Sequence, residues 1–161
     1  MTPELRATLQ GVARAMAVFP EGWWIIGSAA VLLHGVEAGR VNDIDLLIDM
    51  SLAEAVLERL GITPLTLPPD PRFRSAVFAR SEAWPVPVEV MAGFQVNTGG
   101  RWRRVEPLSR HRVPVDDTML FVPDRGELLS LFHLFGRSKD APRIAALERA
   151  GARPSAASPA R

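Results

Sequence analysis

The sequence predicts an α/β or α+β domain in which helices flank a mixed β-sheet. Segments with helical and with strand-like spacing of apolar residues alternate along the 161-residue chain. Apolar residues make up 47% of the chain and charged residues 23%, which is enough to bury a core. Because no repeat or linker divides the chain, we expect one domain over residues 1–151 and a flexible tail over residues 152–161.

The predicted helices of the N-terminal half have recognisable caps. Thr2 caps a segment with apolar residues at helical spacing that ends before Pro20. Ser51 and Glu54 have the spacing of a capping box, and Gly61 ends the helix that they open. The predicted elements are, in order, a helix over 2–19, a strand over 23–26, a helix over 28–34, a strand over 43–49 and a helix over 51–60.

Prolines and glycines divide the C-terminal half. Four prolines between residues 63 and 71 enforce a loop, and a Gly-Gly turn lies at 99–100. Asp124 and Glu127 have the spacing of a helix cap, and Gly136 and Gly151 follow apolar helical stretches. The predicted elements are, in order, a hairpin of strands over 74–80 and 86–91, irregular chain or short strands over 101–115, a helix over 124–135 and a last helix over 139–149.

Composition excludes several classes of protein. Lys and Arg total 19 and Asp and Glu 18, and the net charge of +1 argues against bulk binding to nucleic acid or anionic membranes. The absence of cysteine excludes disulfides, thiolate zinc sites and cysteine nucleophiles. The longest apolar run, residues 23–33, is too short to span a bilayer, and the N-terminus lacks the basic segment of a secretory signal. We therefore expect a soluble, cytoplasmic protein with no membrane partner.

Two aspartates project from one face of a predicted strand. Asp43 and Asp45 are separated by one pleat, while Ile44 and Leu46 lie on the opposite, apolar face. Two carboxylates this close repel each other unless a cation lies between them, and their hard oxygen atoms suit Mg²⁺. Glu89 on a later strand can complete a two-metal site, in which one ion activates a hydroxyl and the other holds a leaving pyrophosphate.

Gly27 and Ser28 lie where a predicted strand turns into a predicted helix. The glycine lets the backbone approach a ligand closely, and the free N–H groups at a helix start favour phosphate. Together with the carboxylates, this turn predicts phosphoryl or nucleotidyl transfer.

These motifs resemble those of the nucleotidyltransferase superfamily typified by DNA polymerase β. The likeness rests on Gly27-Ser28, on residues 40–46 (Arg-Val-Asn-Asp-Ile-Asp-Leu) and on the single acid Glu89. Residues 136–140 (Gly-Arg-Ser-Lys-Asp) resemble the C-terminal region of a minimal bacterial branch that includes the AbiEii-type toxin nucleotidyltransferases. The resemblance covers residues 20–150 and implies a nucleotidyltransferase-like core with C-terminal helices.

The resemblance implies transfer of a nucleoside monophosphate from a nucleoside triphosphate (NTP), such as ATP, to an acceptor hydroxyl. The cofactor it implies is Mg²⁺, as two ions. Arg40 is either a phosphate contact or a loop arginine, whereas Lys139 matches the family's lysine and is the only lysine in the chain. The resemblance implies that the two Mg²⁺ ions are bound, and the reaction catalysed, by Asp43, Asp45 and Glu89. It implies that the NTP is bound by Gly27, Ser28, Arg40 and Lys139.

Two positions depart from the family pattern. Phe132 stands where members usually place a lysine, and Arg143 stands where they often carry an acid. His133 and Arg137 could compensate for the missing charge. The alternative is a catalytically weakened protein that binds nucleotide, or only a partner protein, as half of a toxin–antitoxin or regulatory pair.

The acceptor stays open at this stage. The resemblance allows a tRNA end, a protein side chain or a small hydroxylated molecule such as an aminoglycoside. The basic stretch 101–112 indicates either an RNA-binding surface with Trp102 as a stacking platform or an arginine-rich hairpin balanced by acids elsewhere. Because so little chain remains for an acceptor domain, specificity would come from loops, a homodimer or a partner protein.

Overall fold

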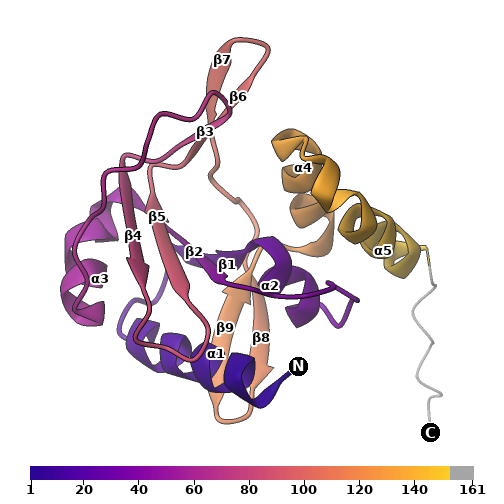
Figure 1. The fold of residues 1–161 in the computed structure, drawn as a ribbon. Helices are drawn as coiled ribbons and strands as arrows, with labels where there is room; N and C mark the ends of the chain where they lie inside the picture. Colours follow the sequence, from indigo (N-terminus) through magenta and orange to yellow (C-terminus); the bar gives the residue numbers. More distant parts are fainter. Residues whose placement is uncertain (153–161) are drawn as a thin grey trace, which may run out of the picture.

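A four-stranded mixed sheet forms the centre of the computed structural model, which describes residues 1–152 (Figure 1). Its strands, in spatial order, are β1 (Trp23–Ile26), β2 (Ile44–Ile48), β5 (Val88–Ala92) and β4 (Val77–Ser81). The outer pairs β1–β2 and β5–β4 are antiparallel, and the central pair β2–β5 is parallel. The predicted mixed sheet and the hairpin of β4 and β5 are therefore confirmed.

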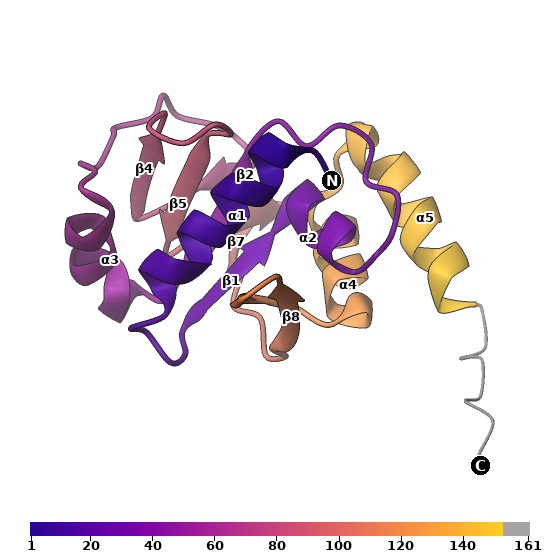
Figure 2. The ribbon, with the colours of Figure 1, turned by 90° about the horizontal axis from the view of Figure 1, so that it is seen from below.

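Helices flank this sheet, as the sequence predicts. The structure contains α1 (Pro3–Met16), α2 (Gly27–Leu33), α3 (Ala53–Leu60), α4 (Arg125–Phe135), α5 (Ala141–Gly151) and the 3₁₀ turns η1 (Met50–Leu52) and η2 (Ser138–Asp140). Figure 2 shows α1 and α2 in front of the strands, and α2 contacts β1, β2, α4 and α5. Within residues 1–152, every helix is too short or too polar to cross a membrane.

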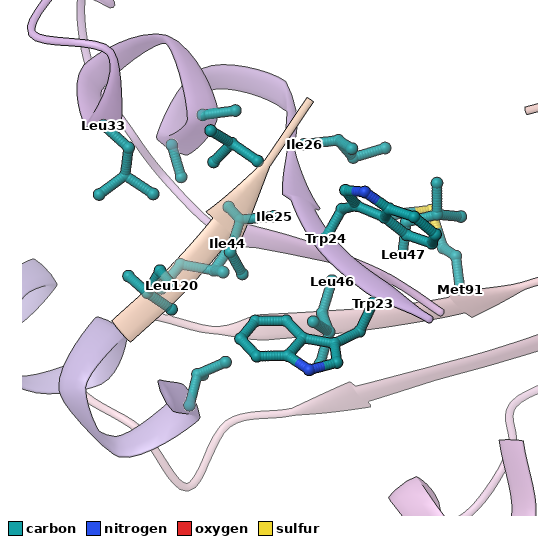
Figure 3. Close-up of a cluster of buried hydrophobic side chains, with 14 of the residues drawn as sticks. Trp23, Trp24, Ile25, Ile26, Leu33, Ile44, Leu46, Leu47, Met91 and Leu120 are labelled. Atoms are coloured by element: carbon teal, nitrogen blue, oxygen red, sulfur yellow. The ribbon is translucent and has the colours of Figure 1, made fainter. Parts of the chain in front are cut away.

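The two faces of the central strands differ in chemistry. Ile44 and Leu46 are fully buried on one face of β2, where apolar burial favours folding (Figure 3). Their register partners Val88 and Val90 on β5 are also fully buried. Because side chains alternate along a strand, the residues between them point to the other face. Asp45 of β2 and Glu89 of β5, two of the acids predicted to be catalytic, lie on that other face.

Two smaller sheets extend the core. One contains β3 (Phe73–Arg74), β6 (Gln95–Thr98) and β7 (Arg101–Arg104), and the other β8 (His111–Val115) and β9 (Thr118–Val122). The β6–β7 hairpin turns at residues 99–100, as predicted, and projects beyond the central sheet (Figure 1). Strands β6 and β9 were not predicted: β6 is short and largely polar, and β9 is a short apolar run, and neither is long enough to show a clear period.

Several predicted boundaries were wrong. Ser51 does not cap a helix: it lies within η1, and α3 begins at Ala53 with no side-chain cap, because the backbone first makes a 3₁₀ turn. The predicted strand over 74–80 is divided, since Arg74 pairs with β6 and β4 begins only at Val77. Lys139 lies in η2, before α5. Apart from Ala152, the predicted tail lies outside the described residues.

Candidate active site

Two acids stand side by side on the polar face of the sheet. Asp45 of β2 and Glu89 of β5 are register partners on adjacent parallel strands, so their side chains leave the same face. Both line a cleft of about 650 Å³. Its other walls come from the loop 65–70, from the small sheet that holds Phe73, and from the end of α4 with Phe135.

The Gly27 turn touches the first of these acids. Gly27 lines the cleft, and its φ of +67° is a conformation that side chains disfavour. A Cβ at this position would lie 2.2 Å from Oδ2 of Asp45. A glycine is therefore needed here for two reasons, the backbone conformation and the close approach of a carboxylate.

Negative charge is concentrated around Asp45. Burial raises the pKa of Asp45 to about 7, and the neighbouring charges of Asp43 and Glu89 act in the same direction. Arg137 and Lys139 act in the opposite direction without offsetting the rise. The carboxyl group therefore lies in a half-buried site with an excess of negative charge.

Glu89 is held by a strand neighbour. Arg80 of β4 is its register partner and donates a hydrogen bond from Nη1 to Oε1 of Glu89. The same guanidinium donates from Nε to Glu82 at 2.6 Å. The side chain of Glu89 is thus fixed at the edge of the cleft by an ion pair.

The donor chemistry fits a hard divalent cation. Asp43 and Asp45 offer carboxylate oxygens, the ligands that Mg²⁺ prefers, and the uncompensated charge at Asp45 favours a cation there. Among residues 1–152, no three His, Asp or Glu side chains are grouped closely enough to form a metal site as they stand. The fit accordingly rests on the two aspartates, with Glu89 paired to Arg80.

Arg137, which the sequence indicates only as a compensating charge and not as a nucleotide-binding residue, faces the same cleft. Arg137 lines the cleft, and its Nε donates to Oδ2 of the fully buried Asp140 at 2.6 Å. Arg143 donates from Nη1 to the other oxygen of Asp140 at 3.0 Å. The signal for Arg137 was present, because it belongs to the Gly-Arg-Ser-Lys-Asp segment.

The two departures from the family pattern have structural roles here. Phe132 is 1% exposed and packs edge-on against Phe135, so a lysine at this position would bury its charge in the core. Arg143 also donates to the carbonyl oxygen of Ala38 at 3.0 Å. It thereby ties η2 and α5 to the loop that leads into Asp43.

The structure brings some of the predicted residues together and not others. Gly27, Asp45 and Glu89 line one cleft, and the charges of Asp43 and Lys139 act on Asp45 from beside it. The buried Ser28 and the exposed Arg40 are not among the residues that line the cleft. His133 is exposed near Glu148 and does not line it either.

The basic stretch 101–112 is partly engaged within the protein. Arg74 stacks over the ring of Trp102 at 4.1 Å, so one face of the predicted stacking platform is already covered. Arg110 stacks over Phe121 at 3.4 Å and donates to the carbonyl of Pro20. Arg101 and Arg103 are exposed on the β6–β7 hairpin.

No family model matches the chain, and no curated protein matches its sequence. Solved structures do match. A candidate nucleotidyltransferase of Thermotoga maritima, TM1012, superposes with a TM-score of 0.73 at 18% identity, over 95% of this chain and 96% of that chain.

Two antibiotic-modifying proteins match in the same way. ANT(2")-Ia, solved in complex with adenylyl-2"-tobramycin, has a TM-score of 0.60 at 12% identity over 92% of this chain and 90% of its own. The lincosamide antibiotic adenylyltransferase LnuA, solved with lincomycin, has a TM-score of 0.58 at 17% identity, over 92% of this chain and 97% of its own. The chain therefore has the nucleotidyltransferase fold predicted from its motifs, whereas the AbiEii-type branch stays a prediction.

Proposed function

We propose that the protein is a Mg²⁺-dependent nucleotidyltransferase that moves a nucleoside monophosphate from an NTP to an acceptor hydroxyl. One observation carries the proposal. Asp45 and Glu89 face a single cleft from adjacent parallel strands, at the point where the Gly27 turn touches Asp45. The shared fold supports the same reaction class.

The proposed reaction is a single displacement at the α-phosphorus. The acceptor oxygen forms a bond to the α-phosphorus, and its proton passes to a carboxylate on the cleft floor. The bond between the α-phosphorus and the bridging oxygen breaks, and pyrophosphate leaves with the electron pair. Glu89, fixed by Arg80 at the edge of the cleft, would orient the acceptor side.

The triphosphate would lie on the Gly27 side of the cleft. Gly27 and Ser28 would bring backbone N–H groups to the triphosphate. Arg137 and Lys139 lie near enough to Asp45 for their positive charges to lower its pKa, so they would also lie near the phosphates. Asp140 holds Nε of Arg137 and so orients the rest of that guanidinium. Arg40 on the exposed loop before Asp43 is the remaining proposed phosphate contact.

Asp43 and Asp45, with Glu89, would hold the Mg²⁺ ions. Bound there, Mg²⁺ would supply positive charge that offsets the phosphates and the carboxylates. The protein's own contribution is to fix the carboxylates in a half-buried site with a glycine turn against one of them.

Label transfer tests the proposed function. The purified protein is incubated with each α-labelled NTP, Mg²⁺ and a cell extract, beside an Asp43→Ala/Asp45→Ala double variant and an Asp49→Ala control. Asp49 follows the same strand and is exposed, so its replacement should leave the cleft intact. We expect label transfer with the wild type and the control and at least a 100-fold loss in the double variant, on the order of the loss of a charge-stabilising group.

A protein that binds labelled NTP but transfers nothing contradicts the proposal. That outcome favours the alternative, a nucleotide-binding or partner-binding member of a regulatory pair.

A further inference from the structure

The surface beside Glu89 is apolar. On the same face of the sheet, Met91 follows Glu89 along β5, and Phe78 of β4 is the register partner of Met91. Both side chains line the cleft. An acceptor whose hydroxyl lies at Glu89 therefore meets apolar side chains one step further along the two strands, at Met91 and Phe78.

The loop 65–70 adds two leucines to this surface. Leu65 and Leu67 line the cleft although they are 49% and 52% exposed. The loop is tied to the sheet edge, because the N–H of Leu65 donates to the carbonyl of Phe78 at 2.7 Å. Four prolines between residues 63 and 71 restrict its backbone, so the surface is formed before a ligand arrives. Exposed apolar side chains in a concave site are typical of a surface that an apolar ligand covers.

The charged groups around this part of the cleft are already paired. Arg80 is bound to Glu82 and Glu89. Arg74 donates to Gln95 at 2.6 Å and stacks on Trp102.

The acid at the far end of the loop is paired in a similar way. Oδ1 of Asp70 accepts the backbone N–H groups of Arg72 and Phe73. These contacts leave few free donors and acceptors around the loop for a highly charged acceptor, and the excess negative charge at Asp45 is the charge that Mg²⁺ would offset.

We propose that the acceptor is a small, neutral molecule with an aromatic or aliphatic body and a reactive hydroxyl. The body lies against Phe78, Met91 and the loop leucines, and the hydroxyl reaches toward Glu89. This inference rests on the proposed function for its reaction and on the apolar wall for its ligand class. The cleft of about 650 Å³, which the acceptor would share with the NTP, falls within the usual range of small-molecule sites.

A neutral fluorescent probe tests the ligand class without any nucleotide. N-phenyl-1-naphthylamine is titrated into the wild type, Leu67→Glu and Leu108→Glu. Leu108 is 95% exposed and does not line the cleft, so it is a matched leucine control. We expect equal binding by the wild type and Leu108→Glu and about tenfold weaker binding by Leu67→Glu, because a carboxylate against an apolar ligand loses hydration. Equal binding by all three proteins, or none by the wild type, overturns the proposal.

Fractionated label transfer tests the same inference as a reaction. The extract is divided into RNA, protein, small polar cations and small neutral organic-soluble molecules before incubation with α-labelled NTP and Mg²⁺. We expect label in the last fraction, and less of it with Leu67→Glu than with Leu108→Glu. Label in the RNA, protein or cation fraction overturns the inference but leaves the proposed function standing. Transfer to no fraction contradicts the proposed function, while the probe titration still decides the ligand class.

Discussion

Gly27 shows at the scale of one residue why the site requires its particular sequence. Its backbone conformation and its approach to Asp45 both exclude a side chain. Gly39 has almost the same φ, +68° against +67°, yet a Cβ there would have no atom within 4 Å. Comparing the two glycines therefore separates the effect of the backbone conformation from the effect of the close approach to Asp45.

We predict that Gly27→Ala destabilises the protein more than Gly39→Ala. Gly39→Ala should lower the free energy of unfolding by about 1 kcal/mol, because alanine disfavours the left-handed backbone conformation. Gly27→Ala should cost about 2 to 4 kcal/mol, because the new methyl group also displaces the Asp45 carboxylate. Denaturant unfolding measures both values, and equal losses would show that the contact with Asp45 is unimportant. Label transfer should fall only in Gly27→Ala.

Asp45 illustrates a residue that is unfavourable for the fold by itself. Its carboxylate is half-buried beside Asp43 and Glu89, so folding concentrates like charges. We predict that Asp45→Asn raises the free energy of unfolding by about 1 to 3 kcal/mol in EDTA, because it removes one of those charges. Excess Mg²⁺ should stabilise the wild type but hardly affect the variant.

Thermal unfolding with EDTA and with Mg²⁺ checks this prediction. Asp49→Asn is the control, since Asp49 is exposed at the end of the same strand and should respond to Mg²⁺ as the wild type does. A wild type that is insensitive to Mg²⁺ would contradict the assignment of a cation to Asp45.

At the scale of elements, the start of α5 is joined to the cleft through one buried acid. Asp140 is fully buried and accepts from Arg137 on one side and Arg143 on the other. Through Arg137 it reaches the cleft, and through Arg143 it reaches the loop at Ala38. The turn η2 therefore connects the C-terminal helices to the cleft and to the loop that leads into Asp43.

We predict that Asp140→Ala lowers the free energy of unfolding by about 2 to 4 kcal/mol, because it leaves the partly buried guanidinium groups of Arg137 and Arg143 without their partner. Asp117→Ala is the matched control, because its ion pair with Arg14, at 3.1 Å, is exposed on both sides. Its loss should cost less than about 1 kcal/mol. Denaturant unfolding compares the two, and a similar small loss for both would show that the buried cluster contributes little.

For the whole molecule, the near balance of charge has a consequence for partners. The net charge is +1. Within the 101–112 region, Arg110 is engaged with an aromatic ring and a backbone carbonyl, and Arg104 is paired with Glu106. Arg101 and Arg103 of the β6–β7 hairpin and Arg112 of β8 are exposed. Non-specific binding to nucleic acid depends on neutralising many phosphates at once.

We predict that single-stranded RNA binds weakly, with a Kd on the order of 10⁻⁵ M or higher at physiological salt. An Arg101→Ser/Arg103→Ser double variant should bind almost as the wild type does. Fluorescence anisotropy with a labelled oligonucleotide, repeated at several salt concentrations, measures both proteins. Tight binding that the double variant loses would assign the hairpin to RNA and weaken the case for a small neutral acceptor.

The sequence by itself determined the central strands and the candidate carboxylates. Alternation along residues 43–49 placed the two aspartates on one face and buried isoleucine and leucine on the other. β2 has this arrangement for Asp45, Ile44 and Leu46, whereas Asp43 lies just before the strand. Such periodicity is local, so it can be read without knowledge of the rest of the chain. The Gly-Ser turn was visible for the same reason.

Only the tertiary structure decided how distant residues meet. The register of β2 with β5 places Glu89 beside Asp45, and the register of β5 with β4 brings Arg80 to Glu89. Arg143 reaches the carbonyl of Ala38 across 105 positions of the chain. These contacts depend on strand register and helix packing, which are long-range properties that spacing along one segment does not encode.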